Sequence, residues 1–241
     1  SLPLLVLSTF ITVLAIIYSI EHLPEPKSPK GFLALILVLE TGMNGTFVAL
    51  DLILFFVFFE IVLLPMYFMI GIWGDKTVRT VSGFKNQIET RLYASIKFFV
   101  FTLFGSAFML LGFLGLYYRG NKTFSIPELI ELGTSGAFTG TFATLVFAVL
   151  FLGFAVKVPM WPLHTWLPDA HTAAPTVGSV LLAAILLKLG SYGFVRIAIP
   201  ILPEQAKAWA PAIAILSAIG IIYGSLACLA QTDLKRLIAF S

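Results

Sequence analysis

Three charged side chains lie in strongly apolar stretches of the sequence. Glu60 lies within FFVFFEIVLLP, Lys157 within GFAVKVP and Lys188 within LLKLGSYG. A charged group at the centre of a lipid bilayer costs roughly 2.5–3.5 kcal/mol on insertion scales. Separate burial of all three would cost on the order of 8–10 kcal/mol, so pairing Glu60 with a lysine is the cheaper arrangement. These residue types favour the passage of a proton, and the alternative is a static ion pair that fixes helix packing.

Two histidines follow Lys157, and an imidazole can accept and release protons near neutral pH. His164 comes seven residues after Lys157, two turns along the same face of a regular helix. A histidine that only packs and hydrogen-bonds fits His164 equally well. His171 follows Pro168 and Asp169 in an expected loop, where it could help a proton to enter, although a solvated side chain is the favoured interpretation.

The composition bounds the class of protein that carries these residues. Hydrophobic residues make up 59% of the 241 residues and charged residues 11%, whereas about a quarter of an ordinary soluble domain is charged. The chain is therefore expected to be an integral membrane protein, not a water-soluble enzyme. The net charge of +3 comes from short connections, so no nucleic-acid partner is expected. The one cysteine, Cys228, is expected to be a small buried side chain, and we expect no cofactor or metal in this chain.

A helix needs about 20 apolar residues to cross a bilayer, and open strand edges are not tolerated there. The sequence therefore predicts an all-α, multi-span helical bundle. Seven spans are expected, at 2–20, 32–49, 51–72, 94–118, 138–167, 175–199 and 209–230, with an eighth beginning near Leu234.

Prolines interrupt the span at 138–167 just after Lys157. Pro159 removes the donor for the carbonyl of Ala155, and Pro162 removes another. Irregular backbone at membrane depth is tolerated where it lines a wet cavity, and broken helices beside charges occur at transport sites. We therefore expect a proline-broken helix that serves transport, with a simple proline kink as the alternative.

Short-range signals predict several local features. Asp51 is expected to cap the third span in a tight hairpin, and segment 41–45, which holds two glycines, is expected to shorten or distort the second span. Ser125 and Glu128 form a capping-box pattern that predicts a short helix lying at the surface. Gly190 and Gly193 are expected to let another helix or water approach closely.

Basic residues predict the orientation of the chain. One side, which we expect to be cytoplasmic, receives Lys27, Lys30, Lys76, Arg79, Lys85, Arg91, Lys235 and Arg236. The opposite side receives Arg119, Lys122, Arg196 and Lys207. The connections 21–31, 73–93 and 168–174 are then cytoplasmic.

Three stretches carry a resemblance to a known family. They are KVPMWPLHTWLPDAHTAAPTVGSVLLAAILLKLGSYG (157–193), FFVFFEIVLLPMYFMIGIWG (55–74) and QTDLKRLIAFS (231–241). They resemble the antiporter-like membrane subunits of respiratory complex I (NADH:quinone oxidoreductase), of the subunit 4 or chain M type. The resemblance extends over the whole chain, and it implies a fragment of a fourteen-helix fold with two inverted five-helix repeats. Residues 1–31 would be a first span and a cytoplasmic loop, 32–199 the first repeat with its half-channel, and 200–241 the truncated start of the second repeat.

The resemblance also implies roles for the charged residues. Glu60 matches the glutamate of helix 5, Lys157 the lysine of the broken helix 7, Lys188 the lysine of helix 8, and His164 the histidine after the break. Together they would move protons, coupled to quinone reduction elsewhere in the complex. NADH, FMN, iron–sulfur clusters and quinone would be held by other subunits, so this chain would be part of a translocase without a redox centre of its own.

The expected partners are other membrane subunits of complex I, including neighbouring antiporter-like subunits, and lipid. The expected location is the bacterial cytoplasmic membrane, with the mitochondrial inner membrane or the thylakoid as alternatives. Two other functions fit the same helices, namely a subunit of a multi-subunit cation/proton antiporter and a subunit of a membrane hydrogenase. A passive membrane scaffold is disfavoured, because a scaffold has no use for three charges at mid-membrane.

Overall fold

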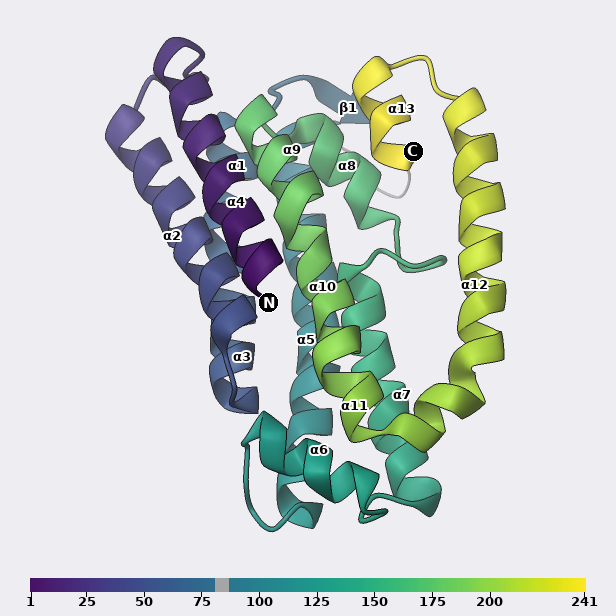
Figure 1. Cartoon of the computed structure of the whole chain (residues 1–241). Helices are drawn as coiled ribbons and strands as arrows, with labels where there is room; N and C mark the ends of the chain where they lie inside the picture. The colour runs from purple at the N-terminus through teal and green to yellow at the C-terminus, as the bar shows by residue number, and fades with distance from the viewer. Residues whose placement is uncertain (81–86) are drawn as a thin grey trace.

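The computed structural model describes residues 1–80 and 87–241, and within these ranges seven helical segments are long and apolar enough to cross a membrane. They are α1 (Leu2–Glu21), α2 (Pro29–Val48), α3 with α4 (Leu52–Ile61 and Leu63–Trp73), α5 (Thr90–Arg119), α7 (Gly140–Lys157), the run from α9 to α11 (Thr176–Ile201) and α12 (Pro203–Leu229) (Figure 1). The predicted all-α bundle of seven spans is confirmed. A further short helix, α13 (Leu234–Phe240), begins where the eighth span was predicted to start.

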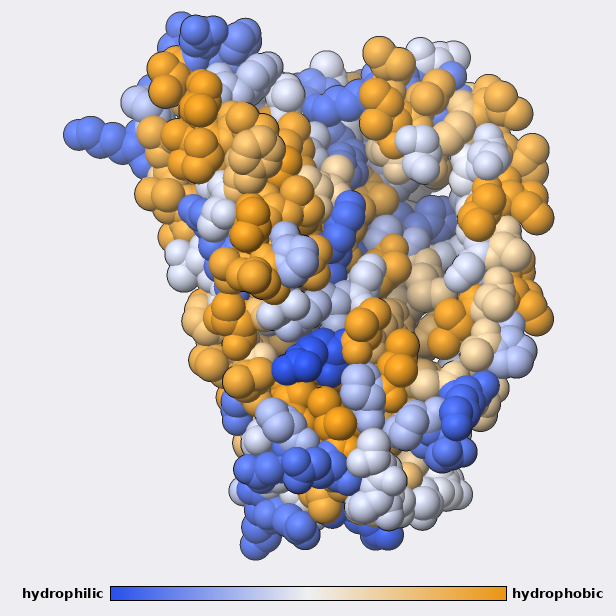
Figure 2. All heavy atoms as spheres, in the orientation of Figure 1, coloured by the Kyte–Doolittle hydropathy of each residue, from blue (hydrophilic) through white to orange (hydrophobic). Residues whose placement is uncertain are grey.

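The bundle is apolar both outside and inside. Figure 2 shows hydrophobic side chains over much of the middle of the molecule and many hydrophilic ones at its two ends, the pattern of a protein that crosses a membrane. Inside, the rings of Phe55, Phe59, Phe113, Phe154 and Tyr192 contact one another with centroid separations of 5.6–6.4 Å. This aromatic core lies where α3, α5, α7 and α10 (Leu187–Gly193) meet.

The tight hairpin between α2 and α3 forms as predicted. The side chain of Asp51 accepts hydrogen bonds from the N–H groups of Ile53 and Leu54 at 2.9 and 3.0 Å, and so caps α3. The predicted distortion of α2 at segment 41–45 is wrong, because α2 runs without interruption to Val48. Its glycines serve packing instead. A Cβ atom added at Gly45 would lie 2.3 Å from the Phe58 ring, so only glycine lets α2 and α3 approach this closely.

The third span is broken beside Glu60, which the sequence analysis did not predict. α3 ends at Ile61, Val62 forms a turn, and α4 begins at Leu63. Pro65 has no N–H to donate to the carbonyl of Ile61, four residues earlier, which accounts for a break at this point.

The short helix predicted after Ser125 is α6 (Ile126–Thr134), which lies across one end of the bundle (Figure 1). The predicted capping box does not form, because the Ser125 side chain makes no capping hydrogen bond. Backbone pairing fixes the start of α6 instead. The N–H of Ile126 donates to the carbonyl of Leu50 at 2.8 Å, and the N–H of Leu52 donates to the carbonyl of Phe124 at 2.9 Å.

The predicted loop at 168–174 is mostly helical, and this prediction is wrong. Helix α8 spans Trp166–Ala173, and Pro168 is compatible with it because proline is tolerated in the first helical turn. His171 therefore lies on a helix, and only 8% of its surface is exposed, so the favoured interpretation of a solvated His171 is also wrong.

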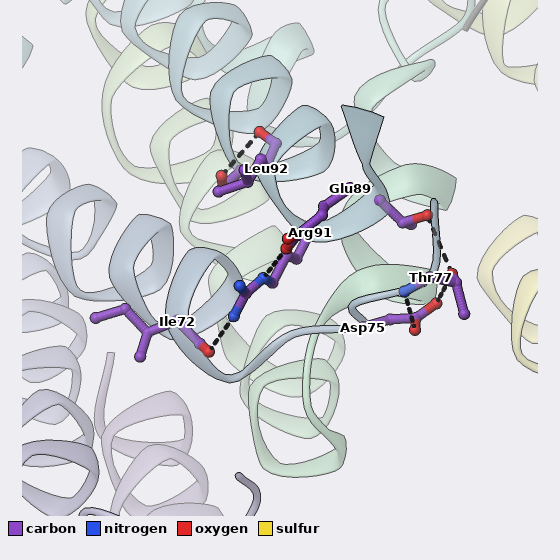
Figure 3. Close-up of polar contacts among 8 residues, drawn as sticks. Ile72, Asp75, Thr77, Glu89, Arg91 and Leu92 are labelled. Atoms are coloured by element: carbon purple, nitrogen blue, oxygen red, sulfur yellow. Dashed lines mark hydrogen bonds and ion pairs between the residues drawn. The ribbon is translucent and has the colours of Figure 1, made fainter. Parts of the chain in front are cut away.

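The connection from α4 to α5 holds a short antiparallel ribbon, β1 (Val78–Thr80) and β2 (Gln87–Glu89). Figure 3 shows how the polar side chains around it lie. Arg91, at the start of α5, donates to the carbonyl of Ile72 at 2.8 Å and to the carboxylate of Glu89 at 2.6 Å. Arg91 thus ties the end of α4 to the start of α5. Lys85, one of the basic residues used to predict orientation, lies outside the described residues.

We predict that Gly45→Ala destabilises the protein by about 1–3 kcal/mol, the usual cost of overpacking a core. A Cβ atom added at Gly220, on α12, meets nothing within 4 Å, which makes Gly220→Ala the matched control. The thermal unfolding midpoint of each purified variant measures the effect. A midpoint for Gly45→Ala equal to that of Gly220→Ala would contradict the packing argument.

Candidate functional site

Lys157 is the last residue of α7 and is buried, with 3% of its surface exposed. Its Nζ atom lies 4.6 Å from the centroid of the Phe59 ring, a cation–π contact. Glu60 follows Phe59 on α3 and is partly buried, and its charge and that of Lys157 attract each other. The structure therefore brings Glu60 and Lys157 into one group.

Glu60 and Lys157 attract each other without touching. Among the described residues, Lys157 Nζ has no hydrogen-bond partner and forms no ion pair within 4.0 Å. A direct salt bridge, and with it the static ion pair considered as the alternative, is therefore absent from this conformation. Burying an ammonium group without a partner costs several kcal/mol. Any movement of Glu60 or of water toward Lys157 therefore strongly changes the free energy of the charged form of Lys157.

The predicted break in the helix follows Lys157 directly. α7 ends there, and residues 158–165 form turns rather than a helix. Pro159 denies the carbonyl of Ala155 its regular donor, and the N–H of Met160 donates to this carbonyl instead, at 2.9 Å. The carbonyl of Ala155 at the end of α7 thus has a hydrogen-bond partner. Residues of the segment 158–165 that follows line a cavity.

Lys188 follows a π-helical turn, η1 (Leu182–Leu186), which the sequence analysis did not predict. The Lys188 ammonium donates a hydrogen bond to the carbonyl of Ala183, five residues earlier and within η1. A second π-helical segment, η2 (Phe194–Ala198), follows α10. Such turns are rare and occur frequently at functional sites. Here η1 supplies a backbone partner to a lysine in the middle of a span.

Lys188 lines a cavity of about 430 Å³ together with both predicted histidines, His164 and His171. The ring of His164 lies edge-on to the ring of Tyr223 on α12, with 5.0 Å between centroids. Its Nδ1 atom is buried and has no hydrogen-bond partner in the described part of the chain. Three of the five predicted site residues therefore share one cavity, while Glu60 and Lys157 form the other group.

Gly190 connects the two groups. A Cβ atom added there would lie 3.0 Å from the Cβ of Lys157 and 2.8 Å from the side chain of Val158. α10 therefore packs directly on the end of α7, two residues beyond Lys188. The predicted close approach at Gly190 is confirmed.

A charged cluster beside the cavity was missed by the sequence analysis. Lys97 on α5 forms a salt bridge of 2.8 Å with Asp169 on α8, and Arg236 on α13 approaches the same carboxylate at 3.9 Å. The available signal was Lys97 itself, because a lysine inside a predicted span needs a partner. No local pattern points to that partner, because Asp169 lies 72 residues further along the chain.

A sequence model of the family described as NADH:quinone oxidoreductase/Mrp antiporter, TM, matches residues 49–241. The chain belongs to this family. NADH-quinone oxidoreductase subunit M of Rhodobacter capsulatus is 47% identical over 88% of the chain, and that of Rickettsia bellii is 42% identical over 98%. NADH-ubiquinone oxidoreductase chain 4 of Mycosarcoma maydis is 41% identical over the full chain. The chain spans 40–46% of the length of these three relatives.

Solved structures show the same fold. A chain of respiratory complex I from Thermus thermophilus superposes with a TM-score of 0.79 at 31% identity, over 98% of this chain and 45% of that one. A chain of an archaeal membrane-bound sulfane sulfur reductase superposes with a TM-score of 0.81 at 24% identity, over 97% of this chain and 45% of that one, and this likeness concerns the fold alone. The antiporter-like architecture of the family thus accounts for the bundle.

We predict that His171 stays neutral at pH 5.5. Burial, and then the nearby charge of Lys235, lower the pKa of His171 to about 4. An unfolded histidine has a pKa near 6.5, so protonation opposes folding and stability falls as the pH drops from about 6.5 toward 4. Nitrogen-15 NMR of histidine-labelled protein, with His171→Gln to assign the signal, measures the titration. A midpoint near pH 6.5 would contradict the buried placement.

Proposed function

We propose that the chain is part of a proton-translocating membrane subunit of an NADH:quinone oxidoreductase. The observation that carries the proposal is Lys157, a buried and unpartnered lysine at a broken helix, within the electrostatic reach of Glu60. Through Gly190, Lys157 also lies against the helix that bears Lys188 and the cavity. A scaffold would gain nothing from this costly arrangement.

The proposed mechanism moves a proton between the two groups. When the Glu60 carboxylate approaches Lys157, it stabilises the ammonium form, and when it withdraws, Lys157 gives its proton up. The proton passes through water and His164 toward Lys188, whose hydrogen bond to Ala183 holds its ammonium at the cavity wall. A change of one pKa unit corresponds to about 1.4 kcal/mol, so modest movements of the carboxylate suffice.

The cofactors and the other functional parts of the complex would belong to other subunits. NADH, FMN, iron–sulfur clusters and quinone would be held by other subunits, and neighbouring antiporter-like subunits and lipid would surround this one. Bacterial relatives named subunit M support the bacterial cytoplasmic membrane as its location. Residues 32–199 would form the first repeat with its half-channel, preceded by the span and loop of 1–31 and followed by the start of the second repeat at 200–241.

A second candidate function is a subunit of a multi-subunit cation/proton antiporter, which the family description also names. Purification of the native assembly distinguishes between the two candidate functions. Flavin, iron–sulfur clusters and NADH:quinone reductase activity that copurify with the chain support the first. Sodium-dependent proton movement without NADH supports the second, and nickel in the assembly would indicate a membrane hydrogenase instead.

We predict that Glu60→Gln and Lys188→Ala each reduce proton pumping at least about tenfold, because the first removes the charge that controls protonation of Lys157 and the second removes a proton carrier. The measurement is NADH-driven acidification of sealed vesicles that contain the assembled complex with the full-length variant chain. Glu128→Gln, on the surface of α6, is the control and should pump at the normal rate. Full pumping by both site variants would refute the relay.

A further inference from the structure

Asp169 is the buried member of a charged cluster that joins three helices. Its side chain is 11% exposed and forms a salt bridge of 2.8 Å with Lys97, whose side chain is 19% exposed. Arg236, with 40% of its side chain exposed, approaches the other carboxylate oxygen at 3.9 Å. Asp169 belongs to α8, Lys97 to α5 and Arg236 to α13. Because little water reaches the salt bridge to Lys97, screening weakens it less than it would a surface pair.

α8 depends on such contacts for its position. It has eight residues, and the broken segment 158–165 separates it from the hydrogen-bond ladder of α7. At the start of α8, the indole of Trp166 donates to the carbonyl of Val156 at 3.0 Å. At its end, the carbonyl of Ala173 accepts from the N–H of Asp75 at 2.8 Å. Between these two anchors, the salt bridge from Asp169 to Lys97 holds α8 against α5.

α8 also supplies one wall of the cavity that contains Lys188. Leu167, Pro168 and His171 line this cavity, and Asp169 lies between them in the sequence. The two sides of α8 therefore have different tasks, since one faces the cavity and the other carries the anchoring carboxylate. A movement of α8 away from α5 would displace His171 and the segment that bears His164.

We propose that Lys97 and Asp169, assisted by Arg236, are positioning residues that hold α8 so that His164 and His171 face Lys188 across the cavity. This inference rests on the proposed function, because it assigns the cluster to the same proton path. The cluster itself carries no proton in this scheme. Removing one of its charges would move His164 and His171 away from their positions at the cavity.

The first test uses Asp169→Asn and Lys97→Met in the full-length chain, in the assembled complex within sealed vesicles. Each change removes the 2.8 Å salt bridge between α5 and α8, and pumping should fall about tenfold, with assembly checked on native gels. Asp169→Glu and the charge swap of Lys97→Asp with Asp169→Lys should restore most of the lost rate. A role in folding alone would lower the amount of assembled complex and leave the rate per assembled complex unchanged.

The matched control is an ion pair that lies on the surface. Lys207 and Glu204 are 3.7 Å apart, with 79% and 77% of their side chains exposed, so Lys207→Met and Glu204→Gln should pump normally. Arg236→Met removes only the longer contact and should lower pumping about twofold without blocking assembly. If Asp169→Asn fails to assemble, Arg236→Met tests the positioning role in its place. A normal pumping rate for Arg236→Met would then overturn the proposal.

The outcomes separate the positioning role from the proposed function. If assembled Asp169→Asn pumps at the full rate while Glu60→Gln and Lys188→Ala do not, the positioning role is overturned and the relay stands. If Glu60→Gln and Lys188→Ala also pump at the full rate, the proposed function fails, and the positioning role fails with it.

Discussion

The free-energy cost of burying the ammonium group of Lys157 explains the arrangement of the groups around it. Lys157 has little access to water and forms no ion pair within 4.0 Å among the described residues. Three weaker attractions act on it together: the face of the Phe59 ring, the field of Glu60, and the negative end of α7, of which Lys157 is the last residue. The prolines after Lys157 end the helix at that point, so the break helps to hold the charge.

Lys188 is exposed at the wall of the cavity, and its ammonium group is held in a different way. Instead of a helix end it has a π-helical turn, and the carbonyl of Ala183 within that turn accepts from its ammonium. It also borders a cavity whose largely apolar lining includes His164 and His171, whereas Lys157 lies against the Phe59 ring. Of the two lysines, Lys157 is therefore enclosed and Lys188 is open, although they lie on helices in direct contact at Gly190.

The sequence was sufficient for features that depend on near neighbours along the chain. The spans follow from apolar length, the cap at Asp51 from residue type, and the break after Lys157 from prolines. It was insufficient where the partner is distant or the signal ambiguous. Pro168 suggested a loop but sits in the first turn of α8, and segment 41–45 suggested distortion but its glycines serve close packing.

The salt bridge between Lys97 and Asp169 shows the limit most clearly, because the two residues are 72 positions apart. Only the packing of α8 on α5 brings them together, and that packing depends on where α7 breaks. Single residues therefore pointed to the candidate proton carriers, whereas the residues proposed to position those carriers are found only from the folded structure.

The contact between α7 and α10 has a consequence for the order of events in the proposed mechanism. Two lysines on helices in direct contact repel each other when both are charged, and the repulsion is strong where water is scarce. In the proposed mechanism, protonation of the enclosed Lys157 would therefore favour release of the proton from Lys188, and that release would favour recharging of Lys157. In that scheme the close approach at Gly190, where an added Cβ atom would lie 3.0 Å from the Cβ of Lys157, would couple the two steps.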